Sequence, residues 1–253
     1  MIISASRRTD IPAFYSNWFI NRLNAEYCLV KNPYNAAQIK RVSLLPEDVD
    51  GIVLWTKNAA PLLPKISQLD RFSYYFQYTI TPYHSDIERG LADKKAIVIP
   101  AFQQFSSIIG AKRMIWRYDP IIITPRYNVD YHIAAFTKLC GMLAGSTEKC
   151  AISFVSNYKS VAKSLVEVGH TELETQDKIR LAEALLLIAK RHGITLCACC
   201  ELPELYEVGV RPVSCVDASL FGVDMPRDKN QREGCNCAAS VDIGVYNSCM
   251  NGS

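Results

Sequence analysis

The sequence predicts an α/β fold, either a TIM-like barrel or a partial (β/α) barrel, with an inserted β-hairpin and an irregular cysteine-rich C-terminal cap. Three observations support this prediction. Short apolar runs alternate with segments of helical periodicity, as expected when buried parallel strands are joined by helices. The chain has 253 residues, 49% of them hydrophobic, which is enough for one large domain. After Glu201 the alternation gives way to loop-like sequence rich in Cys, Asp, Gly and Pro.

Six runs have the length and composition of buried strands, namely 1–6, 51–56, 73–80, 113–117, 150–155 and 194–199. Three segments between them place apolar residues at helical spacing, namely 12–23, 131–143 with Asp130 as its expected N-cap, and 176–192. Segments 27–30 and 38–44 flank a turn-like Asn-Pro-Tyr-Asn and predict a β-hairpin between the first two strands. We therefore expect a barrel domain over 1–201 and a cap over 202–253 that packs on the same domain.

The composition excludes several classes of protein. A net charge of +3 permits an anionic ligand but does not argue for a nucleic-acid surface. No stretch approaches the ~20 apolar residues needed to cross a bilayer, and the first residues lack the apolar run of a signal peptide. We expect a cytoplasmic protein without membrane contact. In that reducing compartment, ten cysteines indicate metal ligands or buried apolar residues rather than disulfides.

Polar side chains follow each predicted strand. Because ligands bind at the carboxyl ends of parallel strands, we expect these groups to converge on one rim. A small anionic ligand would bind there through Arg7, Arg8, Lys57 and Arg117. Further candidate ligand-binding residues are Ser6, Thr56, Asn58 and Gln77, and the fifth strand adds Ser153, Ser156 and Asn157. The candidate catalytic residues are Asp10, Lys57, Asp119 and Glu201, the three carboxyl groups serving proton transfer.

Each of these residues also has a simpler interpretation. Arg7 and Arg8 are equally consistent with solvated side chains, and Arg117 and Asp119 with an ion pair at the barrel mouth. The recurrence of charged or amide groups at five or more strand ends favours a pocket.

Seven of the ten cysteines lie in the last quarter of the chain. Thiolates are the preferred ligands of zinc and of iron–sulfur clusters, so this clustering predicts a metal centre. Cys200, Cys215, Cys235, Cys237 and Cys249 are plausible ligands, and we take the last four as the metal site. Cys28, Cys140, Cys150 and Cys197 are expected to pack in the core. The C-x-C spacing is not that of a zinc finger.

Five motifs in combination resemble an uncharacterised cysteine-rich family, domain of unknown function 1848. They are Ser-Ala-Ser-Arg-Arg-Thr-Asp at 4–10, Trp-Thr-Lys-Asn at 55–58, Trp-Arg-Tyr-Asp-Pro at 116–120, Cys-Val-Asp-Ala-Ser at 215–219 and Cys-x-Cys-x-x-Ser-x-Asp-Ile-Gly-x-Tyr-x-x-Cys at 235–249. The resemblance runs essentially end to end and implies no assigned reaction.

In that family the tail usually continues beyond Cys249 as Cys-x-x-x-Cys-x-Tyr-Cys-Tyr-Ala, which is similar to the three-cysteine loop of radical S-adenosylmethionine enzymes. This implies an iron–sulfur cluster that binds S-adenosylmethionine, and a partial (β/α)₆ barrel. The sequence departs from that pattern because Ser253 stands where the second cysteine belongs. Two expectations stay open: the chain is truncated after Ser253, or its cysteines form a different site.

The leading hypothesis is therefore a metal- or iron–sulfur-binding enzyme with a polar pocket for a small anionic ligand. One alternative is a non-catalytic nucleic-acid-associated module with structural zinc, in which Arg7, Arg8, Arg113, Arg117 and exposed tyrosines supply the surface. The other is an inactive, truncated family member.

Overall fold

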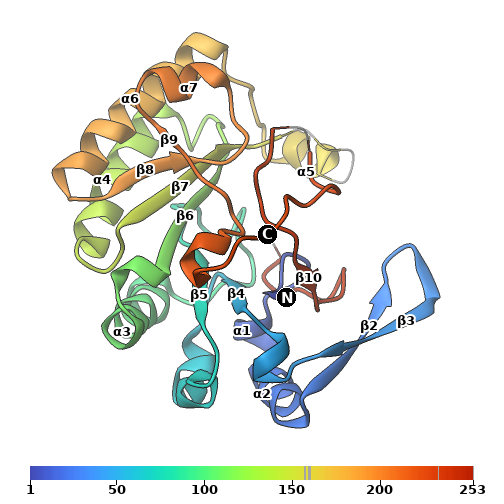
Figure 1. Cartoon of the computed structure of the whole chain (residues 1–253). Coiled ribbons are helices and arrows are strands. Elements are labelled where there is room, and N and C mark those ends of the chain that lie inside the picture. Colours follow the sequence, from blue (N-terminus) through green and yellow to red (C-terminus); the bar gives the residue numbers. More distant parts are fainter. Residues whose placement is uncertain (157, 159–160, 233, 253) are drawn as a thin grey trace.

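An eight-stranded sheet runs through the molecule, and every strand pairing within it is parallel (Figure 1). The computed structural model describes residues 1–156, 158, 161–232 and 234–252, so Asn157 and Ser253 lie outside the described residues. In spatial order the strands are β10 (Val241–Asp242), β1 (Ile2–Ala5), β4 (Gly51–Thr56), β5 (Tyr74–Thr79), β6 (Met114–Ile121), β7 (Lys149–Phe154), β8 (Thr195–Ala198) and β9 (Arg211–Pro212). The predicted α/β class is confirmed, and the six predicted strands are β1 and β4 to β8.

Helices follow the strands. The helical elements are α1 (Ile11–Phe14), α2 (Ser16–Ala25), the 3₁₀-helix η2 (Ala60–Leu69), the π-helical turn η3 (Lys94–Val98), α3 (Ile99–Ile109), α4 (Val129–Leu143), α5 (Ala162–Glu167), α6 (Thr175–Arg191) and α7 (Pro203–Glu207), with shorter 3₁₀ turns η1 (Pro46–Asp48), η4 (Ala111–Arg113) and η5 (Ala218–Phe221). The predicted helix over 12–23 is broken at Tyr15 into α1 and α2. No helix in the described part of the chain combines the length and the apolar character needed to span a bilayer.

The prediction of Asp130 as the N-cap of α4 is wrong. The helix begins two residues earlier, because the side chain of Asn128 accepts a hydrogen bond from the Tyr131 amide at 2.9 Å. Asp130 lies in the first turn instead, where an acidic group interacts favourably with the helix dipole.

The two faces of the sheet pack against different parts of the chain. Successive strand residues point to opposite faces. Ile52 and Leu54 belong to the large core that includes residues of the helices. Val53, between them, packs in a second cluster with Val216 and the buried cysteines of the C-terminal segment. The cysteine-rich segment is therefore the cover of one face of the sheet.

The segment 202–253, predicted as an irregular cap, also contributes the edges of the sheet. Its strand β9 pairs with β8, and its strand β10 pairs with β1 at the opposite end. Between these strands the chain crosses the sheet. The boundary at 201 stays a prediction. The cysteines Cys28, Cys140, Cys150 and Cys197, expected in the core, are buried as predicted.

The inserted hairpin is also confirmed. Strands β2 (Tyr27–Asn32) and β3 (Asn35–Ser43) pair antiparallel and form a separate two-stranded sheet. In Figure 1 this hairpin extends away from the rest of the molecule.

Candidate metal centre

Four cysteine side chains meet over the second face of the sheet, and we call them the thiol group. The sulfur atoms of Cys199, Cys235 and Cys237 all lie within 4.8 Å of one another. Cys215 joins them, because its thiol interacts by hydrogen bonding with those of Cys199 and Cys237. Cys235 and Cys237 are buried, whereas Cys199 and Cys215 are half-buried. Residues separated by up to 38 positions in the sequence (199 to 237) are thus gathered at one point.

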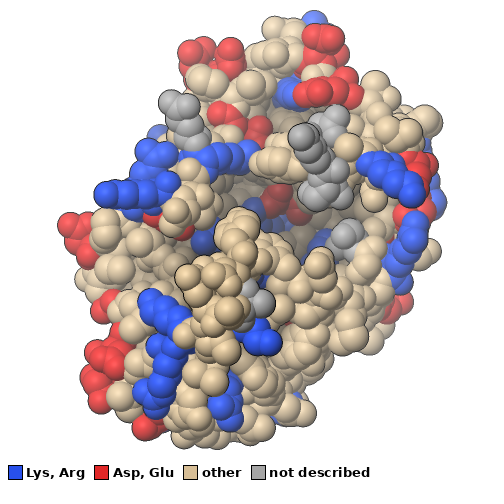
Figure 2. Space-filling model, turned by 90° about the vertical axis from the view of Figure 1, so that its right-hand side faces the viewer, with Lys and Arg blue, Asp and Glu red and all other residues tan. Residues whose placement is uncertain are grey.

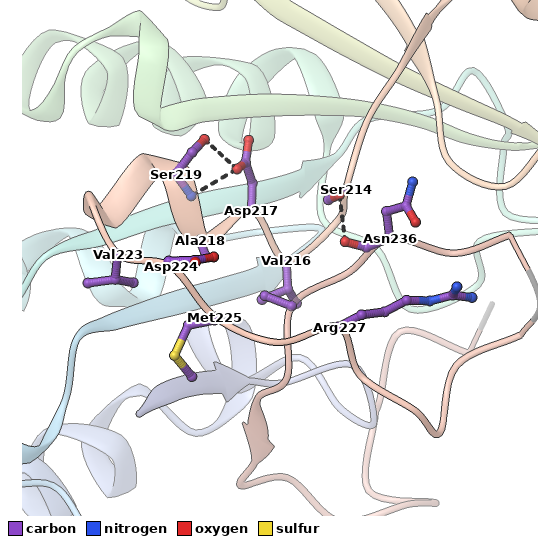
Figure 3. Close-up of a pocket in the computed structure, with 11 residues that line it drawn as sticks. Ser214, Val216, Asp217, Ala218, Ser219, Val223, Asp224, Met225, Arg227 and Asn236 are labelled. Atoms are coloured by element: carbon purple, nitrogen blue, oxygen red, sulfur yellow. Dashed lines mark hydrogen bonds between the residues drawn. The ribbon is translucent and has the colours of Figure 1, made fainter.

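Backbone contacts hold two of the cysteine-bearing segments side by side. The amide of Cys215 donates to the sulfur of Cys237 at 3.2 Å, and the amide of Ala238 donates to the carbonyl of Val216 at 2.9 Å. The hydroxyl of Ser214 donates to the carbonyl of Asn236 at 2.9 Å, as drawn in Figure 3. The same segments line the pocket of about 360 Å³ shown there.

Arg117 supplies a half-buried positive charge beside the thiol group. It lies on β6, and its Nη1 donates to the sulfur of Cys215 at 3.2 Å and to Oε1 of Gln77 at 3.3 Å. Its Nη2 pairs with Asp119. Hydrogen bonds from Cys199 and Cys237, together with the charge of Arg117, outweigh burial and hold the pKa of Cys215 well below its usual value. Cys215 therefore ionises more readily than Cys199 and Cys237, whose pKa values are raised.

The donor set fits a metal bound by thiolates. A tetrahedral zinc site with Zn–S bonds of about 2.3 Å places its sulfurs about 3.8 Å apart, which a limit of 4.8 Å accommodates. The N–H donated by Cys215 and the guanidinium of Arg117 are the kind of outer contacts that orient and charge-balance ligating thiolates.

A cavity of about 320 Å³ lies beside the thiol group. It is lined by Cys199 and Cys215, by the carboxyl ends of β6 and β7, and by polar side chains that include Asp119, Ser153 and Arg232. The molecule is hollowed on the face seen in Figure 2, where basic and acidic side chains lie within the depression. A small ligand in the cavity would touch both the thiols and these polar groups.

Three of the four predicted cysteine ligands, Cys215, Cys235 and Cys237, belong to the thiol group. The fourth, Cys249, is exposed and is not among the sulfurs that lie within 4.8 Å of one another. Cys199 is not among the ligands predicted from the sequence. The predicted strand includes that residue, whereas β8 ends at Ala198 and the chain turns at Cys200, which has a φ of 59°.

The predicted polar residues of the first four strands of the chain's parallel series lie at the carboxyl ends of adjacent strands, where hydrogen bonds group them into clusters. The guanidinium groups of Arg7 and Arg117 both lie over the ring of Trp55, at 5.9 and 5.3 Å from its centroid.

In the first cluster, the buried carboxylate of Asp10 accepts hydrogen bonds from Thr56 Oγ1 and the Lys57 amide, both at 2.7 Å, and from Asn251 Nδ2 at 3.0 Å. Burial raises the pKa of Asp10, and these hydrogen bonds offset only part of that effect. Asn58 accepts a hydrogen bond from the amide of Ala60 at 3.1 Å. Asp10 thus joins the ends of two strands to the C-terminal segment.

A second cluster surrounds Asp242 of β10, which the sequence analysis did not single out. Its carboxylate accepts hydrogen bonds from the hydroxyls of Ser4 at 2.9 Å and Ser6 at 2.6 Å and from the amide of Arg7 at 2.8 Å. The amide of Gly244 donates to it at 2.9 Å. This carboxylate therefore binds the N-terminal Ser-Ala-Ser-Arg motif of the chain, and the Asp-Ile-Gly of the C-terminal motif at 242–244 was the available sequence signal.

Each predicted anion-binding cation lies near a carboxylate. Arg117 pairs with Asp119, and Lys57 with Glu88 at 2.5 Å. The side chain of Arg7 lies 3.7 Å from Asp228, and that of Arg8 lies 3.9 Å from Asp242. Glu201, a predicted proton-transfer group, accepts a hydrogen bond from the Phe154 amide at 3.2 Å, and burial raises its pKa to about 7.

The ion pair of Lys57 predicts a measurable pH dependence. Burial alone would raise the pKa of Glu88, but Lys57 and Lys94 outweigh it, so the folded pKa lies below the ordinary value of 4.5. A carboxyl with a depressed pKa stabilises the fold fully above its unfolded value, and this stabilisation is lost as the pH falls through the folded value. We expect the difference in free energy of unfolding between the wild type and Glu88→Gln to shrink below about pH 4.5.

Urea unfolding at several acidic pH values measures this difference. Glu47→Gln, which changes an exposed carboxyl, is the matched control and should show no comparable trend. A Glu88→Gln difference that stays constant with pH would contradict the ion-pair assignment.

Comparison with known proteins identifies one family. The family described as "Domain of unknown function (DUF1848)" matches residues 2–253, the whole chain apart from its first residue. No curated protein matches the chain.

Proposed function

The chain belongs to the DUF1848 family, and we propose that its thiol group holds a resident metal centre that serves a ligand-binding cavity. The observation that carries this proposal is the convergence of Cys199, Cys235 and Cys237 within 4.8 Å, with Cys215 in hydrogen-bonding contact. Thiols this close are either ligands of a shared ion or an oxidation hazard, and a reducing cytoplasm is the compartment in which they would be loaded.

The protein's own residues would perform three tasks at this centre. Arg117 would stabilise the thiolate of Cys215 by charge and by its hydrogen bond. The amide of Cys215 would orient the sulfur of Cys237. In the adjacent cavity, Arg232 and Ser153 would contact an anionic group of a small ligand. When bound, zinc would supply a structural cross-link or Lewis acidity, and an iron–sulfur cluster would supply electron transfer.

A mononuclear zinc site is the first candidate, because the short sulfur separations suit one shared ion better than a cube of irons. An iron–sulfur enzyme of the radical S-adenosylmethionine kind is the second. It is favoured by the order of β1, β4, β5, β6, β7 and β8, six parallel strands in chain sequence, as in the partial (β/α)₆ barrel of those enzymes. Under this second candidate we also propose that the sheet curves into a closed or partial barrel.

Metal and acid-labile sulfide analysis of protein purified without oxygen tests the proposal. We expect about one zinc ion per chain and no sulfide for the first candidate. Iron together with sulfide, and a visible absorption that bleaches on reduction, would select the second. Protein that stays metal-free after incubation with zinc and with ferrous iron plus sulfide would overturn the proposal.

A further inference from the structure

We propose that the β2–β3 hairpin is a binding arm for single-stranded nucleic acid. Charge is the first observation. Residues 27–46 contain Lys31, Lys40 and Arg41 and no acidic residue, although the whole chain is nearly balanced, with 28 basic and 25 acidic residues. All three basic side chains are exposed, and within the described residues none of them forms an ion pair. The arm therefore offers uncompensated positive charge.

The register places this charge on both faces of the ribbon. Leu29 lies opposite Arg41, and Lys31 lies opposite Ile39. These four residues share one face, because residues two apart in a strand point the same way. All four are exposed. Lys40, opposite Val30, points to the other face. A flexible polyanion that wraps the ribbon would meet basic groups on either side.

The tip of the arm carries an aromatic ring in solvent. Tyr34 is 94% exposed, the largest exposure among the large hydrophobic side chains described. Its backbone is nevertheless fixed, because its amide donates to Asn32 Oδ1 at 2.9 Å and Asn32 Nδ2 donates to Gln38 at 2.7 Å. An exposed ring on an ordered turn, beside amide side chains, is a platform on which a base can stack.

A cleft continues the basic surface toward the sheet. A space of about 440 Å³ separates the arm from β10, and its charged lining consists of Arg8, Lys31, Lys40 and Asp242. The Asp242 carboxylate is already engaged by Ser4, Ser6 and backbone amides. The net field of the cleft therefore favours a phosphate backbone that runs from the tip toward the strand ends.

The alternative partners fit these observations less well. A second copy of this chain would bring the same basic ribbon, so like charges would face each other. An acidic protein would satisfy the charges but would leave the ring of Tyr34 without a matching base. Arg117, a candidate for a nucleic-acid surface on sequence grounds, is committed to Asp119 and Cys215 and contributes nothing to this arm.

Fluorescence anisotropy with a 20-nucleotide mixed-sequence single strand and the full chain tests the proposal at about 50 and 200 mM salt. We expect the triple variant Lys31→Gln, Lys40→Gln, Arg41→Gln to lose at least tenfold in affinity at low salt. The slope of log affinity against log salt should fall by about 2 for three lost phosphate contacts. Tyr34→Ala should lose about tenfold with the slope unchanged, because stacking does not release counterions.

The matched control is a triple variant that removes the same charge from exposed helical positions, namely Lys163→Gln, Lys190→Gln, Arg191→Gln. It should leave the affinity for the single strand unchanged. The same sequence as a duplex should bind more weakly. Four results would overturn the proposal: no binding at low salt, equal loss in the control variant, equal binding of polyglutamate, or a dimer that the arm variants dissolve. The free energy of unfolding from thermal melts should lie within about 0.5 kcal/mol of the wild-type value for each variant, which checks that these surface substitutions leave the fold intact.

Discussion

Replacing Cys237 by serine is expected to reduce bound metal from about one ion per chain to below a tenth of that amount. Cys237 is buried, its sulfur lies within 4.8 Å of those of Cys199 and Cys235, and it accepts the amide hydrogen bond of Cys215. A serine hydroxyl is a poor ligand at neutral pH, so the remaining thiols would bind far more weakly. The melting temperature should fall with the metal, because binding free energy contributes to folding.

The matched comparison is between Cys199→Ser and Cys249→Ser. The first removes a member of the thiol group that the sequence analysis missed. The second changes an exposed cysteine that the sequence analysis had placed in the site. Metal analysis by mass spectrometry should show loss for Cys199→Ser and retention for Cys249→Ser. The reverse pattern would restore the ligand set expected from sequence and reject the assembly described here.

The second large effect is expected from Asp242→Asn. Its carboxylate accepts hydrogen bonds from two hydroxyls and two backbone amides, and its side chain is only 7% exposed. In the variant, an amide NH₂ group would replace one carboxylate oxygen. Because NH₂ is itself a donor, the hydroxyl or amide that donated to that oxygen would lose its acceptor. Each unsatisfied buried group costs about 1–3 kcal/mol, so we expect a loss of about 2–4 kcal/mol in the free energy of unfolding.

Urea unfolding measures this loss, and Asp224→Asn is the control. Asp224 lies in the same C-terminal segment but is exposed, so its substitution should stay within about 0.5 kcal/mol of the wild type. If Asp242→Asn also stays within that range, the hydroxyls of Ser4 and Ser6 find other partners, and Asp242 does not hold the two ends of the chain together.

Hydrophobic periodicity predicted most of the fold, because buried parallel strands and their covering helices leave a strong local pattern. The strand Gly51–Thr56 was predicted to the residue. The start of α4 was missed because Asn128 and Asp130 are both good N-caps, and only the packed structure decides between them.

The candidate site was harder to predict, because it depends on contacts between distant segments. The sequence indicated that cysteines would gather, but not that Cys199 rather than Cys249 would lie beside Cys235 and Cys237. It also could not assign a carboxylate to each cation, since Glu88 and Asp242 are far in sequence from Lys57 and Arg8. Local pattern carries no information about such pairings.

The pairing of β10 with β1 has a consequence for how the protein is made. Ile3 pairs with Val241, which lies 238 positions later in the sequence, and the hydrogen bond from Ser4 to Asp242 spans the same separation. Contacts between residues so far apart in the sequence form late in folding. On the ribosome, at about 5–20 residues per second, β1 would keep an open edge for roughly ten seconds or more before its neighbour emerges. The nascent chain is therefore expected to need shielding by a chaperone until β10 has paired with β1.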